Sequence, residues 1–420
     1  MNYNTITLRN GLRIIHLPSA SPVVYCGYEI NAGSRDESRE QEGIAHYCEH
    51  TTFKGTCRRN ALQIINSLER VGGDLNAYTN KEDTVYYAAI LHEHLPKAVD
   101  LLTDIVFHST YPQAELEKEV EVICDEIEIY NDSPAELIYD EFENLVFKGH
   151  PLGHKILGDA DQLRTYGTED AVRFTRKYYR PDNAIFFAYG DVDFSRLIKL
   201  LEKATSDFPA ATANIEDLPI SSGGSIDKNN DSIASNEQPQ TVEIDKHTHQ
   251  AHVMLGHRAY DVHDERRMAL YLLNNILGGP SMNTRLNLSL RERHGLVYSV
   301  ESSMVSYSDT GLWSVYFGCD MKDVNRCLRL VRKELDKLMA QPLTEAQLKA
   351  AKRQIKGQIG VACDNRENFA LDFGKSFLHY GWEKDITSLY NHIDAITAQQ
   401  MQDVAQEIFA PEKISTLIFK

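Results

Sequence analysis

Several classes of protein are excluded by what this chain of 420 residues lacks. It has no stretch near the roughly 18 uninterrupted apolar residues that a membrane-spanning helix requires. Its seven cysteines are odd in number and scattered, which is typical of reduced thiols and not of a disulfide framework. The N-terminus lacks a basic region followed by an apolar stretch, so we expect no signal peptide and a cytoplasmic location.

Positive charge is also scarce. The chain has 44 lysines and arginines against 61 aspartates and glutamates, which gives a formal net charge of −17. This balance argues against nucleic acid as a partner and favours solubility. The surplus of acid can also attract basic peptides, although a solvated acidic surface is the simpler explanation.

The most informative segment is His46-Tyr47-Cys48-Glu49-His50. On a helix, the two histidines lie about 40° apart and the glutamate lies on the same side. One turn can therefore offer two neutral nitrogen ligands to a metal and direct a carboxylate at a water molecule, which suits a hydrolytic zinc site. The order His-x-x-Glu-His is the inverted form of the zinc-peptidase motif. Alone, the same residues are also compatible with an ordinary helix.

A catalytic zinc needs a third protein ligand, and the helix expected at 113–130 is the best place to search for it. Its apolar residues recur at spacings of three and four: Leu116, Val120, Ile123, Cys124, Ile127 and Tyr130. Glu119 and Glu126 fall at the shoulder of this apolar stripe, whereas the other acids lie on the far side. A carboxylate at the edge of a core requires a partner. That partner is either zinc or a salt-bridging Arg or Lys.

Further segments occur in a fixed order along nearly the whole chain. They are Asn10-Gly11-Leu12-Arg13, Ala32 to Glu37, Gly43-Ile44-Ala45, Phe53-Lys54-Gly55-Thr56, Asn76 to Thr79, Pro151-Leu152-Gly153, Ile156-Leu157-Gly158, Leu277-Gly278-Gly279 and Leu290 to Ser299. In these residues the chain resembles the M16 metallopeptidases, the group of pitrilysin, insulin-degrading enzyme and mitochondrial processing peptidase, in its short two-domain bacterial form.

The resemblance implies a role for each candidate residue of the first half. His46, His50 and Glu126 would bind zinc, one ion per chain. Glu49 would be the general base that takes a proton from water and later hands it to the leaving amine. Glu119 would orient a ligand or carry a proton from outside the coordination shell.

The resemblance also implies residues that hold the substrate. Arg291 and Tyr298, seven positions apart, resemble the pair that grips the substrate backbone and helps to hold the oxyanion. Asn76, Ala77, Tyr78 and Thr79 would offer a sheet edge to an extended peptide. Without the resemblance, Tyr298 would be interpreted as a core tyrosine and Arg291 as a surface helix residue.

Two departures from the family pattern lie in the metal turn. Cys48 stands where the family usually has a bulky apolar residue, and Thr51-Thr52 follows where apolar residues are common. A thiolate is a good zinc ligand, so Cys48 is a possible competitor. Two residues after His46 on a helix it points about 200° away, and we therefore expect it to pack in the core.

Length and pattern predict two domains and an α+β fold. A stretch rich in Ser, Gly and Asn divides the chain into a zinc-binding catalytic domain (1–206), a linker or mobile insert (207–240) and a C-terminal domain without metal that carries Arg291 and Tyr298 (241–420). Each half begins with alternating strand-like segments and continues with a long helix. We expect two homologous α/β-sandwich domains from a duplicated unit, each a mostly antiparallel sheet packed with helices.

The predicted function is a zinc-dependent endopeptidase or oligopeptidase that cleaves unfolded peptides. The alternatives are a noncatalytic M16-like scaffold or helper subunit, or a processing peptidase for one precursor. Scaffold members generally lose metal ligands, which this chain keeps. Longer relatives enclose substrate between four such domains, so the resemblance implies a homodimer; a heterodimer with an inactive homologue is the alternative.

Overall fold

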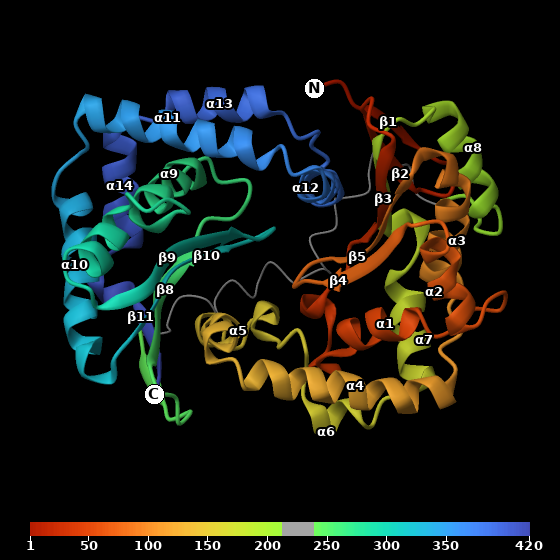
Figure 1. Cartoon of the computed structure of the whole chain (residues 1–420), viewed down its shortest axis with the longest axis horizontal. Coiled ribbons are helices and arrows are strands. Elements are labelled where there is room, and N and C mark those ends of the chain that lie inside the picture. Colours follow the sequence, from red (N-terminus) through yellow and green to blue (C-terminus); the bar gives the residue numbers. More distant parts are fainter. Residues whose placement is uncertain (212–238) are drawn as a thin grey trace. The chain divides into compact units, whose positions relative to one another are not determined.

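The computed structural model of the protein describes residues 1–211 and 239–420, which form two compact units (Figure 1). The first consists of Met1–Glu128, the described part of His150–Ile226 and Ala362–Asp385. The second consists of Ile129–Gly149, the described part of Asp227–Val361, and Ile386–Lys420. The predicted linker at 207–240 lies mostly outside the described residues. Within the described ranges, no helix is both long and apolar enough to cross a membrane.

The first unit is built on a six-stranded sheet with the order β1-β2-β6-β3-β5-β4. Only β2 and β6 pair in parallel; the other neighbours are antiparallel. The strands are β1 (Asn4–Thr7), β2 (Arg13–Pro18), β3 (Val23–Ile30), β4 (Asp74–Thr79), β5 (Thr84–Leu91) and β6 (Ala184–Gly190). Because β4 pairs with β5 alone among the described strands, it is one of the two edge strands of this sheet, and β1 is the other.

Helices cover both faces of that sheet. On one face they enclose the apolar core together with alternate residues of β3, namely Val24, Cys26, Tyr28 and Ile30. The helices that follow the strands are α1 (Ile44–Thr52), α2 (Ala61–Glu69), α3 (Leu95–His108), α4 (Gln113–Asn131), α6 (Ala160–Leu163), α7 (Thr168–Tyr178) and α8 (Phe194–Ala204). The other face is covered by α12 (Arg366–Tyr380), which contacts β3 and β6.

The second unit is built on a five-stranded sheet with the order β7-β11-β8-β10-β9. Its strands are β7 (Thr241–Ile244), β8 (Ala251–Ala259), β9 (Val297–Ser306), β10 (Gly311–Cys319) and β11 (Ser415–Phe419). Its helices are α5 (Pro134–Val146), α9 (Arg267–Gly278), α10 (Val324–Ala340), α11 (Glu345–Ala362), α13 (Ile386–Ala395) and α14 (Ala398–Ile408). Trp313, Val315 and Phe317 of β10 lie at the centre of its core.

The two sheets repeat one topology, which confirms the predicted duplication and the α+β fold. Each sheet contains a parallel pair, β2 with β6 in the first and β7 with β11 in the second. Next to this pair lie three antiparallel strands, in the order β3-β5-β4 in the first sheet and β8-β10-β9 in the second. The helix at the place of α1 in the second repeat is α9, which has no His-x-x-Glu-His sequence. The second repeat therefore keeps the scaffold without the metal motif.

The repeats exchange one helix each. Helix α5 of the first repeat contacts β8 and β11, and α12 of the second repeat contacts β3 and β6. The predicted domain boundaries follow the sequence repeats, whereas the compact units include this exchange. Both helices are amphipathic, and an apolar stripe specifies burial against a sheet without specifying which sheet.

A buried carboxyl group lies between β3 and α12 in the first unit. Glu29 is fully buried, and neither of its carboxyl oxygens has a hydrogen-bond partner in the described part of the chain. It packs on the backbone of α12 at Gly374, where an added Cβ would lie 2.3 Å from Oε1. Asp83 lies nearby and accepts hydrogen bonds from Lys375 (2.9 Å) and His379 (3.3 Å). Burial, then the charge of Asp83, raises the pKa of Glu29 well above its usual value.

We expect Glu29→Gln to remove part of the pH dependence of stability. Because the folded pKa is raised, the unfolded chain releases this proton from about pH 4.3 while the folded chain keeps it. The free energy of unfolding therefore falls as the pH rises, by at most about 1.4 kcal/mol per pH unit. Relative to the wild type, Glu29→Gln should become more stable in urea unfolding as the pH rises above about 5. Parallel pH profiles would contradict this account; exposed Glu40→Gln is the control.

Candidate metal centre

The helix that carries the metal motif has a fixed N-terminus. The buried carboxylate of Glu37 accepts hydrogen bonds from the backbone N–H groups of Gly43 (2.9 Å) and Ala45 (2.8 Å). Gly43 adopts φ +84°, and its Cα packs so closely on Gly158 that a Cβ would lie 2.7 Å from it. A carboxylate at a helix N-terminus satisfies free N–H groups and complements the helix dipole. These contacts fix the start of α1 and hence the direction of its side chains.

Helix α4 runs from Gln113 to Asn131, one residue longer than predicted. The expected distribution of its acids is confirmed: Glu119 and Glu126 are partly buried, whereas Glu117, Glu121, Asp125 and Glu128 are exposed. The period of the helix therefore brings two carboxylates, seven residues apart, to the side that faces α1.

Three potential ligand atoms converge between α1 and α4. One donor atom from each of His46, His50 and Glu126 lies within 4.8 Å of the others. Oε2 of Glu126 lies 3.2 Å from Nε2 of His50 and 3.8 Å from Nε2 of His46. Donors about 2.1 Å from a tetrahedral zinc are separated by roughly 3.4 Å, so the two histidine–glutamate distances are close to those around a bound ion. The zinc-ligand roles stay a prediction, which this geometry supports.

The carboxylates around His50 favour a positive charge at this position, as a metal site requires. Its Nδ1 lies 3.1 Å from Oε1 of Glu119, so the ring donates there and leaves Nε2 directed at Glu126. Burial acts to lower the pKa of His50, but Glu119 and Glu126 outweigh it and raise the pKa to about 9. A divalent cation would take the place of the proton that these carboxylates attract to His50.

His46 is the more deeply buried imidazole of the pair. Burial, then the charge of His50, lowers its pKa to about 4, so the ring is neutral at pH 7. Its Nδ1 has no hydrogen-bond partner among the described residues, and its Nε2 faces Glu126. A neutral imidazole is the form that coordinates zinc.

Glu119 has a second partner, Lys54, whose Nζ lies 2.5 Å from Oε2. Burial raises the pKa of Glu119, but His50 and Lys54 together lower it below its usual value. The salt bridge considered as an alternative from the sequence is therefore present at Glu119. Glu126, in contrast, pairs with the two histidines, and within the described residues no Lys or Arg forms a salt bridge with it.

Glu49 lies on the same turn of α1 and is 8% exposed. Its Oε2 accepts a hydrogen bond from the Thr79 hydroxyl at 2.8 Å. Burial raises the pKa of Glu49, and the bond from Thr79 partly opposes that shift. A carboxylate whose pKa is raised toward neutrality is better suited to general-base catalysis.

The departures at Cys48 and Thr52 have a structural explanation. Cys48 is fully buried and faces the Ala171 carbonyl of α7, as expected for core packing. Burial raises the pKa of its thiol well above the usual value, so it remains a neutral thiol. The Thr52 hydroxyl donates to the Cys48 carbonyl (2.7 Å) and contacts the hydroxyls of Tyr111 (3.2 Å) and Tyr86 (3.3 Å). Polar residues here thus anchor α1 to a buried hydroxyl network.

The predicted substrate strand, Asn76 to Thr79, lies in β4 at the free edge of the sheet. Asn76 is exposed, Ala77 and Tyr78 are partly buried, and Thr79 is buried against Glu49. The first unit therefore brings an open strand edge next to the metal helix. Its role in binding peptide stays a prediction.

Arg291 and Tyr298 lie together in the second unit. The Arg291 guanidinium is 5.8 Å from the centroid of the Tyr298 ring, and Tyr298 is 85% exposed. Arg291 is part of a π-helical turn, Asn287–Glu292, a distortion that often accompanies functional sites. The exposure of Tyr298 argues against its interpretation as a core residue.

Two supporting residues were not predicted from the sequence. Lys54 lies two residues beyond the end of α1, so no helical spacing indicates its contact with Glu119. Glu37 caps a helix that begins seven residues later, and no local pattern indicates that contact.

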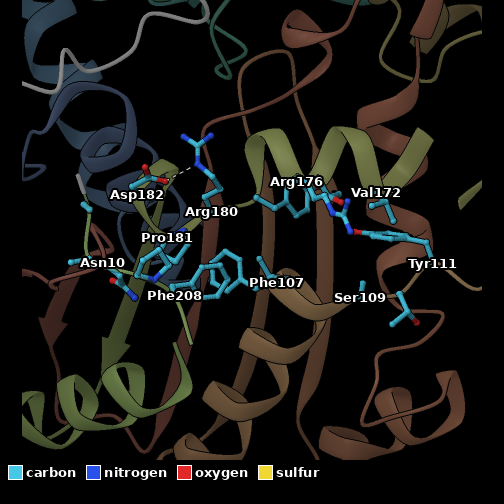
Figure 2. A pocket seen from close by; sticks show the side chains of 17 residues that line it. Asn10, Phe107, Ser109, Tyr111, Val172, Arg176, Arg180, Pro181, Asp182 and Phe208 are labelled. Carbon is cyan, nitrogen blue, oxygen red and sulfur yellow. Dashed lines mark hydrogen bonds and ion pairs between the residues drawn. The ribbon is translucent and has the colours of Figure 1, made fainter. Parts of the chain in front are cut away.

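A separate cavity of about 620 Å³ lies in the first unit (Figure 2). Its walls come from the end of α3, from α7 and from residues 208–211, and include Phe107, Tyr111, Arg176 and Arg180. Arg180 pairs with Asp182 at 2.9 Å. None of the three candidate metal ligands lines it, so the site is assigned by its donor chemistry and not by cavity volume.

Comparison with known proteins agrees with the resemblance. The sequence model described as Insulinase (Peptidase family M16) matches residues 14–160, and the one described as Peptidase M16 inactive domain matches residues 167–355. The candidate zinc ligands and Glu49 lie in the first match, and Arg291 and Tyr298 lie in the second.

Relatives match over almost the full chain. The "Uncharacterized zinc protease YmxG" of Bacillus subtilis is 32% identical over 98% of this chain and 97% of its own. The "Uncharacterized zinc protease SCO5738" of Streptomyces coelicolor is 33% identical over 96% of this chain and 86% of its own. A crystal structure of a protease from Helicobacter pylori shares the fold, with a TM-score of 0.88 and 22% identity over 100% of this chain and 99% of that one. By its sequence and its duplicated fold, the chain belongs to peptidase family M16.

Proposed function

We propose that this protein is a zinc-dependent endopeptidase or oligopeptidase that cleaves unfolded peptides. The observation that carries the proposal is the convergence of His46, His50 and Glu126 within 4.8 Å, with Glu49 on the same helical turn. The relatives named as zinc proteases support the same metal. A protein that serves only as a scaffold would not need to keep this donor set together with a base.

Each residue has a task in the proposed reaction. His46, His50 and Glu126 would hold a zinc ion, which would supply Lewis acidity toward the scissile carbonyl and the attacking water. Glu49 accepts the proton of the water and returns it to the leaving amine. Glu119 fixes the tautomer of His50 through its Nδ1.

The free edge of β4 supports an extended peptide as the substrate. Such a peptide adds as a strand through main-chain hydrogen bonds, which tolerate many side chains. A folded protein has no free segment of this form, so it should be a poor substrate.

Purified protein tests this proposal directly. We expect about one zinc per chain by metal analysis, cleavage of an unstructured peptide library by mass spectrometry, loss of cleavage with a chelator and recovery with added zinc. A zinc-loaded chain that cleaves none of the peptides, or a metal-free chain that cleaves them fully, would overturn it.

We also propose a homodimer in which Arg291 and Tyr298 of one subunit serve zinc held by the other. The exposed Arg291 and Tyr298 pair, carried by the repeat without a metal motif, supports this arrangement. Glu49→Gln and Arg291→Ala should each be inactive alone. When the two variants are mixed and exchange subunits, about half of the dimers contain one copy of each variant, and such a dimer has one complete site of two. The mixture should therefore recover about a quarter of wild-type activity. No recovery after verified exchange, or a fully active monomer, would contradict the shared site.

A further inference from the structure

We propose that Thr79 is the positioning residue for the catalytic carboxylate of Glu49, so that the strand offered to the peptide also orients the base. The inference rests on the proposed peptidase function and adds a residue to it. It concerns the hydroxyl of Thr79, whereas the predicted peptide binding by β4 concerns the backbone of that strand.

The contact between the two residues is short and protected from water. The Thr79 hydroxyl donates to Oε2 of Glu49 at 2.8 Å, and the two residues are 9% and 8% exposed. Among the described residues, no other group donates a hydrogen bond to this carboxylate. One oxygen is therefore held by Thr79, and the other remains available to accept a proton.

Thr79 is itself rigidly placed. It ends β4 opposite Thr84 of β5, and the following turn is closed by a hydrogen bond from the Asn80 N–H to the Asp83 carbonyl at 2.8 Å. The Ser34 N–H donates to the Asn80 carbonyl at 3.1 Å, which ties the turn to the segment that ends in Glu37.

Glu37 closes this path, because its carboxylate caps α1, the helix that carries Glu49. The hydrogen bond between Thr79 and Glu49 thus closes a ring of contacts that runs from β4 through the turn and Glu37 to α1 and back. Such a ring fixes the carboxylate more firmly than a lone hydrogen bond on a loop would.

The orientation of a general base has a direct effect on rate. A glutamate side chain has three rotatable bonds, and a base must lie within hydrogen-bond reach of the proton it takes. A displacement of about 1 Å can lower a rate on the order of 100-fold. Valine at position 79 keeps the shape and the backbone of β4 but leaves Oε2 without its donor. Peptide binding should therefore persist while the chemical step slows.

The test compares Thr79→Val with Thr79→Ser and with a matched control, Thr84→Val. Thr84 faces Thr79 across the two strands and donates its hydroxyl to the Ala32 carbonyl at 2.9 Å, so its replacement removes an equally buried bond that does not involve Glu49. We expect Thr79→Val to lower kcat roughly 10- to 100-fold, with KM changed by less than about twofold and zinc content unchanged. Thr79→Ser and Thr84→Val should stay within about threefold of the wild type.

Three results would overturn the inference: unchanged kcat in Thr79→Val, an effect on KM alone, or an equal loss of kcat in Thr84→Val. Failure of the proposed function looks different, because the wild type would then show no zinc-dependent cleavage. If the wild type cleaves peptides and Thr79→Val is fully active, only the proposed role of Thr79 is wrong.

Discussion

Glu49→Gln is expected to abolish most peptide hydrolysis while leaving the zinc in place. Glutamine has the size of glutamate and keeps an acceptor for the Thr79 hydroxyl, but it cannot take a proton from water. General-base catalysis contributes on the order of 10²- to 10⁴-fold, so kcat should fall by that factor. Because Glu49 is not one of the three converging donors, metal content should remain about one zinc per chain.

The control is Glu40→Gln, which removes an exposed acid before α1 and should keep full activity. If Glu49→Gln retained activity within tenfold of the wild type, another group would have to be the base. If it lost zinc, Glu49 would instead act as a ligand, and the assignment of Glu126 would need revision.

Glu126→Gln is expected to weaken zinc binding far more than substitution of a residue outside the coordination shell. Residues outside the coordination shell typically cost 10- to 100-fold in metal affinity, and loss of a charged ligand should exceed that range. In Glu126→Gln the donor nearest Nε2 of His50 becomes a neutral amide, so peptide cleavage should be lost with the metal. Glu128→Gln, two residues on and exposed on the same helix, is the matched control.

Thermal unfolding distinguishes the two variants without reference to activity. A ligand at 100 times its dissociation constant stabilises the folded state by about 2.7 kcal/mol. Added zinc should therefore raise Tm in the wild type and in Glu128→Gln, but not in Glu126→Gln at the same concentration. An equal rise in all three proteins would exclude Glu126 as a ligand.

Short-range periodicity predicted which residues are candidate metal donors, whereas the choice of Glu126 over Glu119 came from the resemblance to family M16. A spacing of four residues on α1 places His46 beside His50, and a spacing of seven on α4 places Glu119 and Glu126 on the same side of that helix. The supporting contacts depend on the tertiary fold and have no such signal. Glu37 and Thr79 reach α1 from a loop and from a separate strand, so their roles emerge only once the fold is known.

The fold was predictable to a similar depth. Alternating apolar segments and a Ser- and Gly-rich break indicate two α/β repeats, and the matching strand orders confirm the duplication. The exchange of α5 and α12 was not predicted, because a hydrophobic pattern indicates that a helix is buried but does not indicate which sheet it packs against. The packing of the buried Glu29 carboxyl group against Gly374 of α12 is a consequence of that exchange.

X-ray absorption at the zinc edge of the purified protein is the most direct test of the coordination proposed here. With His46, His50 and Glu126 as ligands, the spectrum should show a shell of nitrogen and oxygen at about 2.0–2.1 Å, scattering from two imidazoles and no sulfur at about 2.3 Å. The same spectrum should lose its intensity in Glu126→Gln as zinc is lost. A zinc–sulfur distance in the wild type would place Cys48 or another thiol at the metal and contradict the account.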